Sequence, residues 1–262
     1  MGQTANTSTA HKFFMLGLLL MVGVTLVFAV KSKRSFNVSE IEVVVDKIKG
    51  QALISKKEIA SKLNQVQGYQ VVGTELKNLN PYLLEQALEK DSRISNAEIF
   101  VDKFNTLQVK VEQSLPIVRI QTSEQSYYLD QDGRRIRWSE NGTIRVPVAT
   151  GNIERYTEDY LEQKQNSTIY QIYDLALRIN EDKKFLSPLI EQIHVEEDQD
   201  IVFVPKLGRE KIHFGKFENI DNKFYRLAEF YRRGLPKEGW GKYEVLRLDF
   251  KDQVVGQKRY NQ

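Results

Sequence analysis

The residues best suited to chemistry in this 262-residue chain are a few carboxylates and histidines beside predicted turns and strands. Asp130 and Asp132 precede Gly133, a spacing that could open a calcium-binding loop. An EF-hand loop needs glycine at its sixth position and a bidentate glutamate at its twelfth. Here the glycine is fourth, so Asp-Gln-Asp-Gly instead favours the tight turn of a β-hairpin.

The three histidines offer little for metal binding or acid–base catalysis. His11 lies near the N-terminus, and His194 and His213 lie on predicted strands without an H-x-H or H-x-x-x-H partner. Glu196 and Glu197 follow His194, but alternate residues of a strand point to opposite faces, so Glu197 belongs to the other face. A half-exposed strand histidine is the favoured interpretation.

Sequence signatures of several enzyme classes are absent, including G-x-S-x-G, the P-loop and G-x-G-x-x-G. The lack of cysteine excludes disulfides, thiolate zinc sites and cysteine nucleophiles. The 38 basic and 35 acidic residues are interspersed, which indicates a solvated surface and no nucleic-acid groove. We therefore expect no catalytic residue, cofactor, metal or small-molecule substrate.

An uncharged run extends from Phe13 to Val30. As a helix it would be about 27 Å long, close to the hydrocarbon thickness of a bilayer. We predict a transmembrane helix at 13–30 after a short cytoplasmic tail at 1–12. The alternative is a cleaved signal peptide, whose apolar region is usually about 7–15 residues long. Flanking charge leaves the orientation open, since three basic residues follow the run and only Lys12 precedes it closely.

A first folded domain is predicted at 35–115, with the element order β-α-α-β-β. Glu58 follows Ser55 at the spacing of a capping box. Asn80 and Pro81 resemble a helix cap followed by proline in the first turn. Ile59, Leu63 and Val66 are expected on one buried helix face, and Leu83, Leu84, Ala87 and Leu88 on another. The expected elements are a strand at 36–46, helices after Ser55 and Asn80, and strands at 94–101 and 106–112.

A strand-rich second domain is predicted at 117–258, before a short tail at 259–262. Its first strands flank the Asp-Gly turn, and Asn141-Gly142 predicts a second turn. Apolar residues at helical spacing predict helices at 156–180 and 222–233. The remaining strands are expected at 190–196, 201–205, 211–214, 243–250 and 253–257, with the last two paired.

The order of these segments resembles the FtsQ/DivIB family of bacterial cell-division proteins. FNVSEIEVVV, the two helices and VKVEQSLPIVRI resemble its POTRA domain. YYLDQDG, VPVATG and IHFGKFENIDNKFYRLAEFY resemble parts of its second domain. The resemblance implies an α+β fold: an N-terminal transmembrane helix, a POTRA domain, and a mostly antiparallel β domain with two helices.

The resemblance also implies a function. Members are non-enzymatic divisome scaffolds that link early division proteins to septal peptidoglycan synthesis. The implied partners are FtsB/DivIC-like and FtsL-like single-span proteins, and other divisome proteins through the POTRA domain. The implied location is the cytoplasmic membrane at the septum, with the N-terminus in the cytoplasm and the folded domains outside. The alternatives are a POTRA-bearing envelope assembly or secretion factor and an anchored envelope enzyme.

The last two predicted strands are the candidate partner-binding surface, because an exposed edge strand can accept a partner strand through main-chain hydrogen bonds. Val254 and Val255 point to opposite faces, so one is expected in the core and the other at the surface. A proline at whichever of Gln253, Val255 and Gln257 directs its amide outward should remove a donor. The candidate residues are Tyr243, Phe250, Asp252, Gln253, Val254, Val255 and Gln257.

Overall fold

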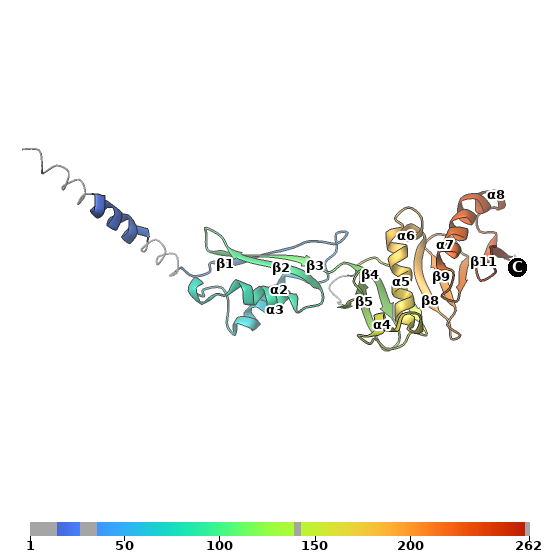
Figure 1. The fold of residues 1–262 in the computed structure, drawn as a ribbon, viewed down its shortest axis with the longest axis horizontal. Helices are drawn as coiled ribbons and strands as arrows, with labels where there is room; N and C mark the ends of the chain where they lie inside the picture. The colour runs from blue at the N-terminus through green and yellow to red at the C-terminus, as the bar shows by residue number, and fades with distance from the viewer. Residues whose placement is uncertain (1–14, 27–35, 139–142, 260–262) are drawn as a thin grey trace, which may run out of the picture. The chain divides into compact units, whose positions relative to one another are not determined.

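The computed structural model describes residues 15–26, 36–138 and 143–259 (Figure 1). They divide into two compact units. Unit 1 combines Met1–Asp46 with Ser55–Glu112, and unit 2 combines Lys47–Ile54 with Gln113–Gln262. The short segment Lys47–Ile54 therefore belongs to the second unit although it lies within the sequence of the first.

Residues 15–26 form a helix with exposed apolar side chains. The predicted transmembrane segment at 13–30 extends beyond this helix on both sides, into positions outside the described residues. No helix in the described part of the chain is both long enough and apolar enough to cross a membrane.

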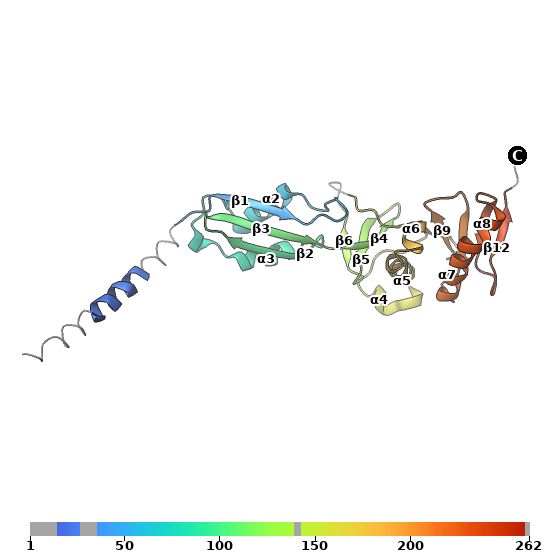
Figure 2. The same ribbon diagram turned by 90° about the horizontal axis from the view of Figure 1, so that it is seen from above.

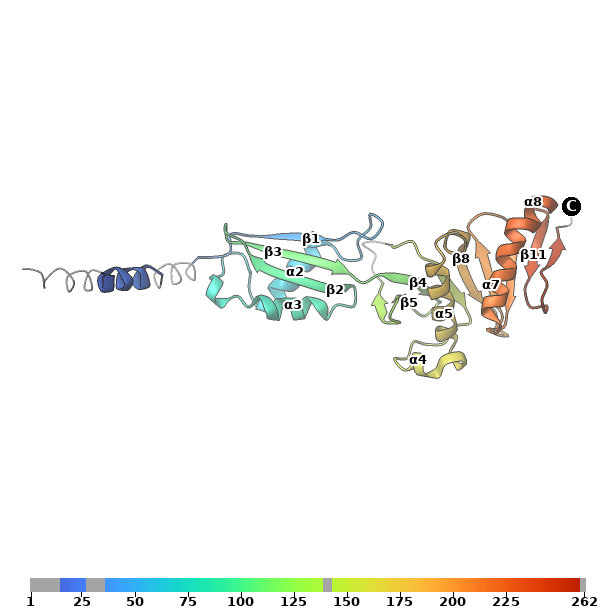
Figure 3. The ribbon, with the colours of Figure 1, turned by 45° about the horizontal axis from the view of Figure 1, so that its top comes forward.

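Unit 1 has the predicted β-α-α-β-β order and contains a three-stranded sheet ordered β1-β3-β2, with β1 parallel to β3. In Figure 3, α2 and α3 cover the same face of this sheet. The elements are β1 (Glu40–Val45), α2 (Lys56–Gln67), the 3-10 turn η1 (Leu76–Asn78), α3 (Pro81–Glu89), β2 (Ile94–Val101) and β3 (Thr106–Gln113).

Both helices of unit 1 begin with the caps that their sequences predict. The Ser55 side chain accepts from the Glu58 amide while the Glu58 carboxylate accepts from the Ser55 amide. Asn80 accepts from the Leu83 amide, with Pro81 in the first turn. The expected faces were partly wrong, because Val66 and Leu83 are exposed: the core sides of these short helices are narrower than the apolar stripes.

Unit 2 is built on a nine-stranded mixed sheet ordered β12-β11-β10-β9-β8-β7-β4-β5-β6. Five neighbouring pairs are antiparallel and three are parallel, namely β4–β7, β7–β8 and β10–β11. The strands are β4 (Pro116–Gln121), β5 (Ser126–Asp130), β6 (Arg135–Arg137), β7 (Val148–Gly151), β8 (Ile190–Val195), β9 (Ile201–Pro205), β10 (Lys211–Gly215), β11 (Tyr243–Arg247) and β12 (Val255–Lys258).

The helices of unit 2 differ from the expected two. The helix predicted at 156–180 is broken into α4 (Tyr160–Gln163), the 3-10 turn η2 (Lys164–Asn166) and α5 (Thr168–Glu181), because Lys164 has a positive φ and Ser167 caps a new helix. The helix predicted at 222–233 is α7 (Ile220–Glu229), which continues as the π-helical η3 (Phe230–Gly234). The short helices α6 (Leu186–Leu189) and α8 (Leu235–Glu238) were not expected.

The main core of unit 2 lies between the sheet and these helices. Figure 2 shows α5 and α7 on the same side of the sheet. Apolar residues of α5, including Ile172, Leu175 and Ile179, are buried there with Phe203 and Phe214 of the central strands. A second, smaller cluster contains Leu53, Tyr128, Ile136 and Ile144. The predicted turn at Asn141-Gly142 lies outside the described residues.

Candidate functional site

The candidate surface lies at one edge of the large sheet. Among the residues that the structure describes, β12 is the outermost strand of the sheet. It pairs in antiparallel fashion with β11, from Arg247 opposite Val255 to Tyr243 opposite Lys258. All seven residues predicted for partner binding lie on β11, on β12 or in the loop between them. The structure therefore places them along one strand pair, with a loop at one end.

The side chains differ in what they offer. Val254, the last residue before β12, packs against the core, while Val255, the first residue of the strand, is exposed. Phe250 is exposed in the loop, beyond the end of β11. Tyr243 and Phe250 were expected to offer aromatic contact area near the same edge, but Tyr243 lies at the other end of β11 from the Phe250 loop. Its ring is half-buried, 5.8 Å from the ring of Phe230.

Tyr243 also lies against the backbone of β12. A Cβ added to Gly256 would come within 2.4 Å of the Tyr243 ring, so only glycine fits beneath that ring. The aromatic side chain thus packs closely over a residue that has no side chain of its own.

The backbone amides of β12 alternate in direction. The Arg259 amide donates to the Lys242 carbonyl at 3.0 Å, toward β11. By alternation, the amides of Val255 and Gln257 also face β11, and those of Gly256 and Lys258 face outward. The outward donors were expected among Gln253, Val255 and Gln257. The register corrects that expectation, because it is the even-numbered residues of β12 that face away.

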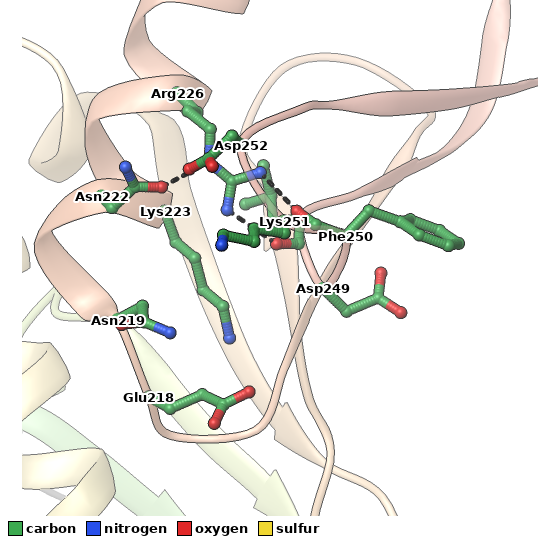
Figure 4. Close-up of a pocket in the computed structure, with 10 residues that line it drawn as sticks. Glu218, Asn219, Asn222, Lys223, Arg226, Asp249, Phe250, Lys251 and Asp252 are labelled. Carbon is green, nitrogen blue, oxygen red and sulfur yellow. Dashed lines mark hydrogen bonds between the residues drawn. The ribbon is translucent and has the colours of Figure 1, made fainter.

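Arg226 of α7 fixes the loop that joins β11 to β12 (Figure 4). Its guanidinium donates to the carbonyls of Leu248 and Phe250 at 2.9 Å each, and to that of Gln253. Its Nε donates to Asn222 Oδ1 at 2.7 Å within the same helix. A single side chain therefore holds three loop carbonyls, and no local sequence pattern indicates this role.

A pocket of about 310 Å³ opens between α7 and this loop (Figure 4). Lys223 is almost fully buried beside it, where its Nζ donates to the Lys216 carbonyl at 2.7 Å and lies 4.8 Å from the centre of the Phe214 ring. Burial lowers the pKa of Lys223. The lining residues are Glu218, Asn219, Asn222, Lys223, Arg226, Leu248, Asp249, Phe250, Lys251 and Asp252.

A cluster of charged side chains lies next to this pocket. His213 Nε2 is 3.3 Å from Asp200 Oδ2 and 4.0 Å from Glu196 Oε2. His213 Nδ1 is 3.7 Å from Asp249 Oδ1. Burial alone would raise the pKa of Asp249, but the paired hydrogen bonds from Arg247 outweigh it and hold this pKa below its usual value.

Local sequence spacing indicates no partner for His213, because the carboxylates beside it are distant in the sequence. The three carboxylates come from the end of β8, the start of β9 and the segment after β11, which only the sheet brings together. His194, by contrast, contacts Thr150 Oγ1 through Nδ1 at 2.9 Å. Within the described residues, no group of three or more His, Cys, Asp or Glu side chains is arranged to hold a metal ion.

Comparison with known families identifies both units. A family model described as FtsQ/DivIB, C-terminal related, matches residues 115–257, which is more than half of the chain. A POTRA-like domain model matches residues 37–112. No curated protein matches the chain. The two matched ranges meet between β3 and β4, and neither model is that of an enzyme.

Proposed function

The chain belongs to the FtsQ/DivIB, C-terminal related, family, and from this premise we propose that it is a non-enzymatic scaffold of the bacterial divisome. It links early division proteins to septal peptidoglycan synthesis by binding FtsB/DivIC-like and FtsL-like partners. The POTRA-like unit binds other divisome proteins. A POTRA-bearing assembly factor is a weaker alternative, because the family match over the second unit belongs to cell-division proteins.

The observation that carries this proposal is the open edge of β12. A strand at the edge of a sheet presents unpaired amides and carbonyls that another chain can use. The outward amides of Gly256 and Lys258 supply the donors, and exposed Phe250 and Val255 supply apolar area beside them. Arg226 and Tyr243 hold this edge in a fixed conformation, so a partner strand meets a preformed template.

The edge is tested with a matched pair of variants in the full-length protein. Lys258→Pro removes one outward amide, and Lys258→Ala removes the same side chain while keeping that amide. We expect Lys258→Pro to weaken co-purification of the FtsB-like partner at least tenfold, and Lys258→Ala to leave it unchanged. Both variants must keep the wild-type melting temperature. Wild-type binding by a folded Lys258→Pro protein would exclude strand addition at this edge.

A contact through side chains is tested separately. Phe250→Ala should weaken partner binding by about 1.5–3 kcal/mol if the ring becomes fully buried in the complex. Glu162→Lys, a charge reversal on the exposed surface of α4, serves as the control and should have no effect.

The proposed location is the cytoplasmic membrane at the septum, with the apolar run at 13–30 as a single anchor and the folded units outside the cytoplasm. The family and the length of the apolar run support this topology. Because the chain has no cysteine, a cysteine at exposed Asp132 gives one label site without background. It should react with a membrane-impermeant thiol reagent in cells with a permeabilised outer envelope. Protection until the cytoplasmic membrane is lysed would reverse the topology.

A further inference from the structure

One end of unit 1 carries large apolar side chains that are exposed and lie outside the core of this unit. We call it the entry end, because the chain enters the unit there through Phe36. Its apolar side chains are 46–69% exposed. They come from four separate places in the sequence: Phe36, Tyr69 with Val72, Tyr82 with Leu83, and Phe104.

Hydrogen bonds join these places into one surface. The Ser39 amide donates to the Asn105 carbonyl at 2.9 Å, which places the β2–β3 turn beside the start of β1. The Leu76 amide donates to the Phe36 carbonyl at 2.9 Å. The connection carrying η1 therefore lies against the entering chain. Figures 1 and 3 agree that the β2–β3 turn and the start of β1 lie at the same end of the sheet.

The remaining apolar residues are tied to the same connection. Gln67 Nε2 donates to the Asn78 carbonyl at 3.1 Å and contacts the Tyr69 hydroxyl at 2.6 Å. Two residues after Asn78, Asn80 caps α3, so Tyr82 and Leu83 belong to the first turn of that helix. The surface thus consists of turns and a helix start.

The opposite end of unit 1 has a different character. There α3 ends and β2 begins, with the sequence Lys90-Asp91-Ser92-Arg93. Asp91 and Arg93 are engaged in ion pairs there. The exposed large apolar residue near this end of β1 is the aliphatic Val44. Aromatic exposure is therefore a property of the entry end and not of both ends of the unit.

The position of the entry end in the sequence indicates what can cover it. Phe36 follows Val30, the last residue of the apolar run, by six residues, which span at most about 22 Å when fully extended. Lys103 lies beside Phe104, with its Nζ 4.9 Å from the centre of the ring. Tyrosine is enriched at the boundary between hydrocarbon and water. Phenylalanine and leucine bury apolar area at the same depth, and lysine extends its ammonium group from there toward the headgroups.

Building on the membrane anchor of the proposed function, we propose that the entry end of the POTRA-like unit lies in the headgroup region of the bilayer. Phe36, Phe104 and Tyr82 insert their rings among the lipid headgroups, and Lys103 extends its ammonium toward phosphate. The unit is then held against the membrane by its own surface as well as by the anchor at 13–30. A contact of this kind restricts its orientation and leaves the sheet face and the charged end for other proteins.

Single spin labels on the full-length protein in vesicles of phosphatidylethanolamine and phosphatidylglycerol test this contact. Because the chain has no cysteine, Phe104→Cys, Tyr82→Cys and Lys90→Cys each give one label site. Accessibility to oxygen and to a water-soluble nickel complex reports the depth of each label. We expect the labels at 104 and 82 to be more accessible to oxygen than the label at 90. Their accessibility to the nickel complex should be at least threefold lower than that of the label at 90.

A second variant tests whether the exposed rings, and not only the attachment of the chain through its apolar run, protect the label at 82. Phe36→Ser combined with Phe104→Ser should return the label at 82 toward the nickel accessibility of the label at 90. Phe100→Ser, which removes an exposed aromatic ring from a strand of the same unit, should leave it unchanged.

The outcomes distinguish this inference from the proposed function. If the vesicles retain the protein but the labels at 104 and 82 are as accessible to nickel as the label at 90, the membrane contact alone is overturned. Protein that is not retained by the vesicles would overturn the anchor and, with it, this inference. Protected labels in a protein that does not bind the FtsB-like partner would uphold the contact and count against the proposed partner.

Discussion

A buried ion-pair network stabilises unit 1 at the point where β2 begins. Arg93 donates to both oxygens of Asp91, at 2.9 Å each, and to Glu58 Oε1 at 2.9 Å. Lys62 of α2 also donates to Asp91 Oδ2 at 2.7 Å. Burial alone would raise the pKa of Asp91, but the hydrogen bonds from Arg93 and Lys62 outweigh it and hold this pKa well below its usual value of 3.8.

Asp91→Asn should destabilise unit 1 by about 3–5 kcal/mol at pH 7, because it leaves the buried Arg93 cation without its main counter-ion. Since the pKa of Asp91 is lowered by folding, its contribution is complete above about pH 4 and is lost as the pH falls through the folded-state value. Hydrogen exchange of the α2 amides should therefore separate variant from wild type at pH 7 and much less near pH 2. Glu98→Gln, at an exposed site on β2, is the control. If the exchange rates of variant and wild type differ equally at both pH values, the loss of stability does not come from the charge of Asp91.

Two contacts of this network differ in whether they could be predicted from the sequence. The contact between Ser55 and Glu58 spans three positions, so the capping box could be predicted from spacing alone. The contact of the same Glu58 with Arg93 spans 35 positions and could not. The Arg226 contacts with the loop and the carboxylates around His213 were missed for the same reason: the sheet brings together residues that no local pattern connects.

At the scale of elements, the paired strands β11 and β12 were predicted correctly because strong apolar and turn signals lie close together in the sequence. Their place at the edge of a nine-stranded sheet depends on parallel crossovers such as β10–β11, which local periodicity does not encode. The break between α4 and α5 was also missed. The apolar stripe there continues past Ser167, and the one local signal for a new helix start was Ser167 as an N-cap.

The loop between β11 and β12 gives a prediction at this scale. Arg226→Ala removes the donor to three loop carbonyls, and each hydrogen bond that involves a charged group contributes about 1.5–3 kcal/mol. Amide exchange of Val255 and Gln257 should accelerate at least tenfold. Arg226→Lys should rescue it poorly, because an ammonium group lacks the planar fork. Arg233→Ala, at a largely exposed side chain, should leave exchange in β12 unchanged. Equal exchange rates in all three variants would show that Arg226 does not hold the loop.

At the scale of the whole molecule, the chain is not divided by a single cut in the sequence. Lys47–Ile54 follows β1 of unit 1 but belongs to unit 2, where Leu53 is fully buried in a cluster with Tyr128, Ile136 and Ile144. Sequence reasoning placed the whole of 35–115 in one domain. The β-α-α-β-β order predicted the POTRA fold but could not show that a loop inside it packs elsewhere.

Leu53→Ala should therefore destabilise unit 2, by about 2–5 kcal/mol for a buried leucine, and leave unit 1 nearly unchanged. The matched control is Leu63→Ala, an equally buried leucine of α2, which should act on unit 1 alone. Trp138 packs against the Leu53 cluster, so its fluorescence follows the unfolding of unit 2. A Leu53→Ala protein in which the α2 and α3 amides exchange faster and the Trp138 transition stays in place would contradict this division.

In the proposed function, the open edge of β12 accepts a partner strand. Amide exchange resolved to single residues, measured on the full-length protein with and without the FtsB-like partner, shows whether it does. We expect the outward amides of Gly256 and Lys258 to exchange at least tenfold more slowly in the complex, while those of Val255 and Gln257, already paired with β11, change little. Unchanged exchange at Gly256 and Lys258 in a saturated complex, with new protection on another surface, would contradict it.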